Sequence, residues 1–339
     1  MTSQMFMWQK LKIIIMKRSD FKHFTIGIIA FLVVCLVFRH YLFGNKTYRK
    51  RPLHNDSNID LVLEAALQIK DRPVMITIVN DGYINLVKSW ICNTKHMGFH
   101  QQVIIIVTSP QGIDEIKTIS PDVTVVALDV DQSMNGHQEY SHVGYLKIMV
   151  LRTQIQLALL HNDIEVYSFE CDSVFFANPL PKLRAHSGEH DIVFISNYQR
   201  PKSINGGFLY LFPTPAAKAT FEQLNRMMLK LFSNIRNQPS DKWIPTHEND
   251  QVYLSTLVAE KYAGLKSTIL PFSIFSDGKW YDISEEDRKL TYPFLIHNNW
   301  IKGNIAKEGR AKKWKHWFLK ADGSCDFDWA KEVTKTIIY

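Results

Sequence analysis

Two carboxylates separated by one residue follow an apolar segment in the middle of the chain. Residues 164–169 have the composition of a buried strand, and Glu170 and Asp172 come directly after them. Because successive side chains of an extended backbone point to opposite faces, the two carboxylates share a face at the strand's carboxyl end. Open α/β sheets bind ligands at that end. Paired carboxylates there suit a hard divalent cation, and such a cation suits a diphosphate. An acidic strand-to-loop turn is the structural alternative.

Strand and helix patterns alternate around this acidic pair. Continuous apolar runs are typical of parallel strands buried on both faces, and apolar residues three to four apart indicate helices. In the first half, strands are predicted at 73–79, 102–108, 123–128 and 164–169, and helices at 60–70, 83–97, 111–118 and 145–160. Beyond residue 190, strands are predicted at 191–196, 208–212, 270–275 and 293–297, and helices at 215–231 and 249–261. This order predicts an α/β fold with a doubly wound, mostly parallel sheet and flanking helices.

Other polar residues occur where predicted strands end or begin. Asn80 and Asp81 follow the first strand, in an Asn-Asp-Gly sequence that also suits a simple turn. Asn205 and Gly206 precede a later strand, and the paired glycines there allow either the close approach of a ligand or a tight turn. Each of these pairs therefore has both a structural and a ligand-binding interpretation.

Two further candidates lie in the second half of the chain. Asp250 opens a predicted helix, where either it or Asn249 can act as a cap instead of meeting a ligand. His297 ends the last predicted strand. A single histidine is usually a satisfied core or surface group, but a histidine beside a dicarboxylate is a candidate third metal ligand.

Missing motifs and the charge distribution exclude several functional classes. The 339 residues contain no G-x-G-x-x-G, no G-x-x-x-x-G-K-[ST] and no G-x-S-x-G sequence, which removes the classical dinucleotide, P-loop and hydrolase-elbow interpretations. The formal net charge is +7, but ten of the 40 Lys and Arg residues lie within residues 1–51 beside a single acid, so the remainder carries −2. Nucleic-acid binding requires a basic face on the domain itself, so no nucleic-acid partner is expected.

The basic N-terminal arm contains an apolar stretch that we interpret as a signal-anchor transmembrane segment, residues 24–43. Its length reaches the roughly 20 residues that a bilayer requires, and no small-residue cleavage site follows it. A buried helix is the alternative interpretation. The organisation predicted from this segment is a cytosolic tail at 1–23, the anchor at 24–43, a stem at 44–59 and a catalytic domain at 60–339. Sequons at Asn45 and Asn55 are predicted glycosylation sites and favour a lumenal body.

The four cysteines allow at most one disulfide outside the apolar arm. Cys35 lies within the predicted anchor, and the other three are Cys92, Cys171 and Cys325. Cys171, between the two acids, is expected to be a small buried apolar residue. A bond between Cys92 and Cys325 is possible in an oxidising lumen.

Taken in order, these segments resemble the nucleotide-diphospho-sugar transferases, in particular the group that includes plant cell-wall xylosyl- and arabinosyltransferases and many nematode members. The resemblance covers residues 74–315. Its motifs are Asn80-Asp81 with Trp90, a buried helix with Tyr145 and Arg152, Glu170-x-Asp172 followed by Val174-Phe175-Phe176-Ala177-Asn178-Pro179, Asn205-Gly206-Gly207-Phe208, Asn249-Asp250-Gln251 and His297-Asn298-Asn299-Trp300. Each motif is weak alone, whereas their order and spacing together are specific.

The resemblance implies a GT-A-type fold, a UDP-sugar donor and Mn²⁺ or another divalent cation. It assigns metal binding to Asp172, assisted by Glu170 and His297, and it places Asp250 and Asn205 at the catalytic centre. The residues that it implies for donor binding are Asn80, Asp81, Arg152, Glu170, Asp172 and Gly206. The activity implied is that of a Golgi type II membrane glycosyltransferase that acts on a glycan or glycoprotein acceptor with retention of anomeric configuration.

One position departs from the family pattern. The usual motif is Asp-x-Asp, whereas this chain has Glu170 at the first position, which keeps the charge and adds a methylene. The change bears on donor geometry more than on metal binding. It also supports an alternative hypothesis, that the chain is a membrane-anchored pseudo-transferase that binds glycans or assists another enzyme.

Overall fold

The computed structural model describes residues 57–197 and 200–335 of the chain. The predicted anchor at 24–43 and the sequons at Asn45 and Asn55 lie outside the described residues. The compact unit starts at Ser57, where helix α3 (Ser57–Gln68) begins.

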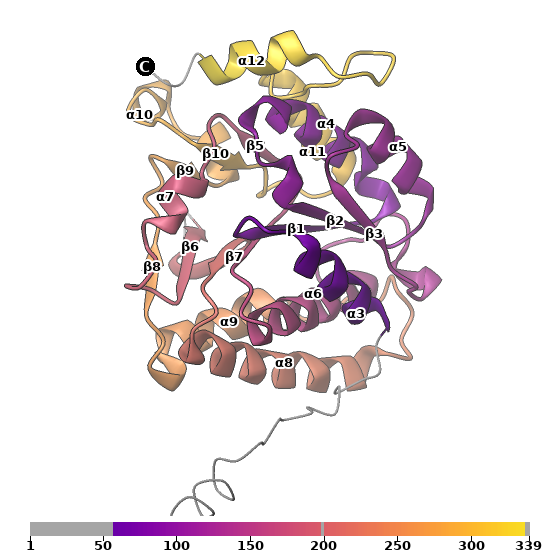
Figure 1. Cartoon of the computed structure of the whole chain (residues 1–339), viewed down its shortest axis with the longest axis vertical. Helices are drawn as coiled ribbons and strands as arrows, with labels where there is room; N and C mark the ends of the chain where they lie inside the picture. The colour runs from indigo at the N-terminus through magenta and orange to yellow at the C-terminus, as the bar shows by residue number, and fades with distance from the viewer. Residues whose placement is uncertain (1–56, 198–199, 336–339) are drawn as a thin grey trace, which may run out of the picture. The chain divides into compact units, whose positions relative to one another are not determined.

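A seven-stranded sheet forms the centre of the unit (Figure 1). Its strand order is β3-β2-β1-β4-β7-β6-β8. Strands β3, β2, β1 and β4 run parallel to one another, β7 is antiparallel to both β4 and β6, and β8 is parallel to β6. The strands are β1 (Val74–Val79), β2 (Val103–Val107), β3 (Thr124–Ala127), β4 (Val166–Phe169), β6 (Ile192–Asn197), β7 (Arg200–Leu211) and β8 (Ser267–Ile269). The predicted mixed α/β fold with a mostly parallel sheet is confirmed.

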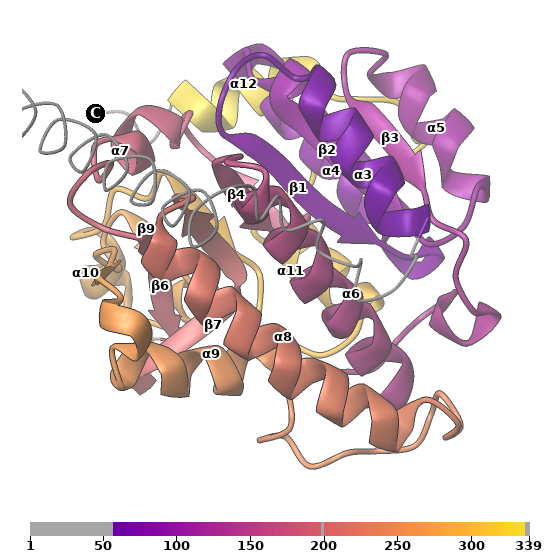
Figure 2. The same cartoon turned by 60° about the horizontal axis from the view of Figure 1, so that its bottom comes forward.

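Helices cover both faces of this sheet, and a separate hydrophobic core lies on each side. One face is covered by α3, α6 (Val143–His161), α8 (Pro215–Ile235) and α9 (Asp250–Ala259), and α6 and α8 lie side by side in both views (Figures 1 and 2). The other face carries α4 (Ile84–Thr94) and α5 (Gln111–Ile119), with α11 (Asn304–Lys313) and α12 (Phe327–Lys335) beyond them. The short helices are α7 (Leu180–Arg184) and α10 (Glu285–Arg288).

Helix α6 is apolar on nearly all sides. Within the described residues it alone is long and apolar enough to cross a membrane, but 83% of its apolar window is buried inside the unit. Burial on all sides explains why its apolar residues show no single face.

A second, three-stranded sheet brings the end of the chain to the acidic pair. It has the order β5-β10-β9, with β5 (Ser173–Phe175), β10 (Leu295–His297) and β9 (Phe275–Ser276). Strand β5 begins directly after Asp172 and runs antiparallel to β10, with Ser173 paired to His297. This register sets the imidazole of His297 beside the carboxylate of Asp172.

The prediction of one strand at 270–275 was wrong. Two strands, β8 and β9, flank this region instead, and residues between them form a turn in which the amides of Ile274 and Phe275 donate to the carbonyl of Pro271. Pro271 has no amide hydrogen to donate to a sheet, which favours the turn. The strand predicted at 208–212 is also longer than expected, because β7 begins at Arg200 and includes both glycines of the Asn-Gly-Gly motif.

A disulfide joins Cys92 of α4 to Cys325, with a Cα–Cα distance of 5.3 Å. This is the possible bond identified from the sequence. Cys171 is a free, buried thiol, as expected. The disulfide fastens the segment between α11 and α12 onto the side of the sheet that carries α4.

Candidate active site

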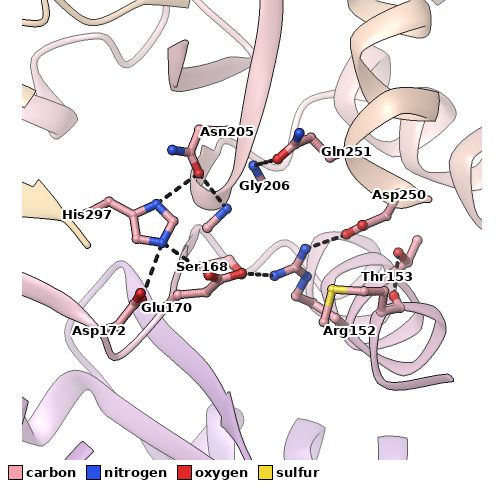
Figure 3. Close-up of polar contacts among 12 residues, drawn as sticks. Arg152, Thr153, Ser168, Glu170, Asp172, Asn205, Gly206, Asp250, Gln251 and His297 are labelled. Atoms are coloured by element: carbon pink, nitrogen blue, oxygen red, sulfur yellow. Dashed lines mark hydrogen bonds and ion pairs between the residues drawn. The ribbon is translucent and has the colours of Figure 1, made fainter. Parts of the chain in front are cut away.

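Glu170, Asp172 and His297 converge at the carboxyl end of β4 (Figure 3). One ligand atom from each of them lies within 4.8 Å of the others. His297 Nε2 is 3.1 Å from Glu170 Oε2 and 3.3 Å from Asp172 Oδ1. The side chains of Asp172 and His297 are fully or almost fully buried, whereas that of Glu170 is 32% exposed. The cluster is therefore open on the side of Glu170.

The orientation of His297 is set by its other ring nitrogen. Nδ1 lies 3.0 Å from Asn205 Oδ1, and the same oxygen accepts the backbone N–H of Gly207 at 3.0 Å. Because Asn205 Oδ1 is an acceptor in both contacts, Nδ1 must carry the hydrogen. In the neutral imidazole Nε2 then has a free lone pair directed at the two carboxylates.

Gly207 is required by the packing of the cluster. A Cβ added there would lie 2.2 Å from His297 Cε1 and 2.9 Å from Glu170 Cδ. These distances are shorter than any real carbon contact, so only glycine lets β7 approach the imidazole this closely.

Arg152 connects Glu170 to Asp250. The guanidinium, on the buried helix α6, lies 3.2 Å from Glu170 Oε1 and 2.5 Å from Asp250 Oδ2. Although its burial favours the neutral form, the carboxylates of Asp250 and Glu170 raise the pKa of Arg152 above its usual value. Asp250 Oδ1, the other carboxylate oxygen, is buried and has no hydrogen-bond partner among the described residues.

Lys307 was not identified from the sequence. Its ammonium lies 2.8 Å from Asp172 Oδ2 and 5.2 Å from the centre of the Tyr83 ring. Burial alone would lower the pKa of Lys307, but Asp172 raises it above its usual value. The only sequence signal is its place ten residues after His297, on a polar helix without apolar periodicity. Asn298 holds that helix in place, because its amide donates to the Lys307 carbonyl at 2.9 Å.

Opposite charges dominate the electrostatics of the site. Burial lowers the pKa of His297, but Asp172 and Glu170 together raise it to about 9. Burial likewise opposes ionisation of Glu170, but the hydrogen bond from His297 lowers the pKa of that carboxyl to about 2. The pKa of Asp172 is held below its usual range against burial, first by Lys307 and then by His297.

The donor atoms fit a divalent cation. Two carboxylates and one imidazole are oxygen and nitrogen ligands of the kind that Mn²⁺ accepts. Both carboxylate oxygens of Asp172 are buried without a hydrogen bond, because the nearby cations of His297 and Lys307 approach within ion-pair distance but outside hydrogen-bond geometry. The unprotonated Nε2 of neutral His297 would supply the third ligand.

The remaining predicted residues surround this cluster. The amide of Gly206 donates to Gln251 Oε1 at 2.9 Å, which joins β7 to α9 beside Asp250. Asn80 ends β1 and is buried, with its Oδ1 unpaired among the described residues. Asp81 has no hydrogen bond or ion pair to the cluster within the described part of the chain. Gln251, absent from the predicted donor-binding and catalytic residues, is thus a further polar group at the site.

Comparison with known proteins identifies the family. The sequence profile of the nucleotide-diphospho-sugar transferases matches residues 98–310. The chain belongs to this family. The matched segment contains every residue of the cluster from Arg152 to Lys307, whereas Asn80 and Asp81 precede it.

The chain is also similar in sequence to a plant glycosyltransferase. It is 22% identical over 275 residues to the β-arabinofuranosyltransferase RAY1 of Arabidopsis thaliana, an alignment that covers 76% of this chain. The aligned part is 49% of RAY1, so the chain spans about half the length of this relative.

Solved glycosyltransferase structures have a lower sequence identity to this chain. GlyE of Streptococcus pneumoniae TIGR4 matches with a TM-score of 0.48 and 11% identity, covering 79% of this chain and 63% of GlyE. The galactosyltransferase LgtC in complex with donor and acceptor sugar analogs matches with a TM-score of 0.44 and 10% identity. The match covers 78% of this chain and 96% of LgtC. Because these TM-scores lie below 0.5, the family assignment rests on the sequence profile.

Proposed function

We propose that this transferase moves a sugar from a UDP-sugar to a glycan or glycoprotein acceptor at the cluster around His297, with Mn²⁺ or another divalent cation as cofactor. The observation that carries the proposal is the convergence of Glu170, Asp172 and His297 at the carboxyl edge of the sheet. These three residues would hold the cation. When bound, it would neutralise the charge that develops on the leaving diphosphate.

Asp250 is the residue best placed to act on the sugar. Its ion pair with Arg152 fixes the direction of the carboxylate, while Oδ1 remains without a partner among the described residues. A carboxylate in this state can accept a hydrogen bond from an acceptor hydroxyl, or stabilise positive charge at the anomeric carbon. Retention of configuration is the stereochemical outcome that we propose.

Asn205 acts mainly as a positioning residue. Its Oδ1 orients His297, and its Nδ2 is buried without a partner among the described residues. The amide hydrogens of this group would donate to a sugar hydroxyl.

We further propose that the protein is a Golgi type II membrane protein anchored by residues 24–43, with its catalytic domain in the lumen. The Cys92–Cys325 disulfide supports this, because disulfides persist in oxidising compartments. Glycosidase treatment of the expressed chain tests the topology. A mobility shift that is lost in the Asn45→Gln/Asn55→Gln double variant would support it. Cleavage of the C-terminal domain by protease added to sealed microsomes would contradict it.

Release of UDP by the purified full chain tests the activity. UDP-galactose, UDP-glucose, UDP-xylose, UDP-arabinofuranose and UDP-N-acetylhexosamines are compared with Mn²⁺ and with chelator. We expect metal-dependent release from one donor that is lost in Asp172→Asn and retained in Asp129→Asn, because Asp129 is an exposed carboxylate at the end of another strand. UDP and Mn²⁺ binding without release from any donor, with acceptor glycans present, would favour the pseudo-transferase.

A further inference from the structure

A shallow hollow lies on the surface past the end of the family match. It has a volume of about 410 Å³ and is lined by Lys312, Lys315, Trp317 and Trp329. The family profile ends at residue 310, so all four residues lie beyond it. Lys312 is at the end of α11, Trp329 is on α12, and Lys315 and Trp317 lie in the segment between these helices that Cys325 links to α4. No residue of the hollow takes part in the cluster around His297.

The two tryptophans present ring surface rather than polar atoms. The indole N–H of Trp329 donates to the Lys315 carbonyl at 2.9 Å, so its only polar atom is satisfied. Trp317 is half-buried against the core on the α4 side of the sheet. The ammonium of Lys312 lies 5.3 Å from the centre of the Trp317 ring. A ligand in the hollow would therefore meet flat apolar faces bordered by ammonium groups.

Lys315 occupies a backbone position that normally favours glycine. It follows the C-terminal end of α11 with φ of 60°, in the left-handed region. The Lys315 amide donates to the Lys312 carbonyl, and the His316 amide donates to the Ala311 carbonyl. This pattern is typical of a turn that ends a helix. Glycine is preferred at this position, and another residue costs on the order of 1 kcal/mol there. A strained lysine beside a hollow points to a use for its side chain.

The basic residues of the C-terminal segment are concentrated at its beginning. Residues 310–320 contain five Lys and Arg residues and no acid, whereas residues 321–335 contain four acids and two lysines. Lys312 is paired with Glu308 at 2.5 Å, one turn earlier on α11, whereas Lys315 has no ion pair with any described residue. The hollow thus offers one free cation and a second that is shared.

We propose that this hollow binds an acidic oligosaccharide, with sugar rings against the indoles and carboxylates on Lys315 and Lys312. Carbohydrate is favoured because the C–H face of a pyranose matches a flat indole face. A membrane surface is disfavoured because both tryptophans are half-buried instead of protruding. The choice of a sugar ligand rests on the proposed function.

The hollow and the candidate active site share a helix. Lys307 and Lys312 both lie on α11, roughly 7.5 Å apart along its axis. They point to different sides, because five residues turn a helix by about 140° beyond a full turn. An acidic chain held at the hollow would lie close to the catalytic cluster without occupying it, as a second contact for an extended acceptor.

Binding of hexagalacturonic acid to the purified full chain, followed by tryptophan fluorescence and calorimetry without donor, tests the proposal. We expect Lys315→Gly to weaken binding by up to roughly fivefold, the upper value for one exposed ion pair. Its melting temperature should be unchanged or higher, since glycine suits the left-handed position. Lys313→Gln, an exposed neighbour that does not line the hollow, should bind like the original chain.

Two other ligands establish what the hollow recognises. Neutral maltohexaose and a hexaglutamate peptide should each bind more weakly, and Trp329→Leu should remove the preference for hexagalacturonate over hexaglutamate. The proposal is overturned by absence of hexagalacturonate binding, by unchanged binding in Lys315→Gly, or by equal binding of the peptide. The Asp172→Asn variant separates this result from the proposed function, because it should lose UDP release and keep hexagalacturonate binding.

Discussion

Asn205 and His297, 92 residues apart in the sequence, are joined by a hydrogen bond of 3.0 Å between Oδ1 and Nδ1. The bond determines which imidazole nitrogen faces Glu170 and Asp172. It therefore couples the Asn-Gly-Gly motif on β7 to the metal-ligand motif after β4.

Replacing Asn205 should weaken metal binding without removing a ligand. Loss of the hydrogen bond that orients a metal-binding histidine typically costs about 10- to 100-fold in affinity. We expect that loss for Mn²⁺ in Asn205→Ala, measured by calorimetry. Asn205→Asp keeps an acceptor for Nδ1 and should recover most of the affinity. Equal Mn²⁺ affinity in the alanine variant would show that His297 does not need Asn205.

Restoring the usual family residue at position 170 should lower activity. Glu170 reaches Arg152 with one oxygen and His297 with the other, at 3.2 and 3.1 Å. Aspartate is one methylene shorter and cannot span both contacts from this backbone. In Glu170→Asp we expect UDP release to fall by about 10-fold or more, the effect of a small misplacement in an active site. Higher UDP release in this variant would contradict the prediction and would mean that Glu170 lowers the activity of the site.

Gly207 and Gly309 form a matched pair for alanine substitution. A Cβ at Gly207 overlaps His297 and Glu170, whereas one at Gly309 meets nothing within 4 Å. Gly207→Ala should abolish Mn²⁺ binding and cost roughly 1–3 kcal/mol of unfolding free energy. Gly309→Ala, in the exposed part of α11, should stabilise by up to about 1 kcal/mol. Calorimetric melting and Mn²⁺ titration measure both effects, and similar behaviour of the two variants would contradict the packing argument.

The acidic pair and the parallel strands were predictable because both depend on local patterns. The apolar run of β2 is buried at every position, as a parallel strand between two helical layers must be. The strand before Glu170 follows the same rule, and its carboxyl end is where a doubly wound sheet collects polar residues. The local pattern thus indicated Glu170 and Asp172 as a pair, and the resemblance to the family added His297 as the third metal ligand.

The rest of the site depends on contacts that no local pattern encodes. Strand β5 has three residues, too few for a periodic signal, yet its pairing with β10 places His297 beside Asp172. Lys307 lies on a helix of mostly polar residues, and its burial follows from its pairing with Asp172. The role of Arg152 between two acids likewise appears only when α6, β4 and α9 are assembled.

The buried imidazole of His100 should make stability depend on pH. Burial and then the charge of Lys95 lower the pKa of His100 to about 4 from a usual value of 6.5. The folded state therefore keeps the ring neutral, held between the hydroxyls of Thr94 and Ser120. The unfolded chain binds a proton below pH 6.5, so stability present above that pH is lost as the pH falls toward 4.

The size of this effect follows from the shift. Each pKa unit corresponds to about 1.4 kcal/mol, so His100 accounts for up to roughly 3 kcal/mol between pH 6.5 and 4. Urea denaturation at both pH values measures it. His100→Gln should lose stability at pH 7 but show a smaller decrease on acidification, whereas the exposed His137→Gln should behave like the original chain. The same decrease in all three proteins would assign acid sensitivity to other groups.

The Cys92–Cys325 disulfide should contribute to the stability of the C-terminal segment more than to catalysis. It closes a loop of 233 residues, and native disulfides contribute roughly 2–5 kcal/mol. In the Cys92→Ser/Cys325→Ser variant we expect a loss within that range, together with early protease cleavage after α11, because the bond is the covalent tie between α4 and the chain that leads into α12. Cys171→Ala, which removes the free buried thiol, is the control for a lost sulfur without a lost cross-link.

Mn²⁺ binding should persist in the folded fraction of the double variant, since neither cysteine touches the cluster around His297. Loss of Mn²⁺ binding before any loss of folded protein would instead show that the disulfide holds α11, and with it Lys307, in the active site.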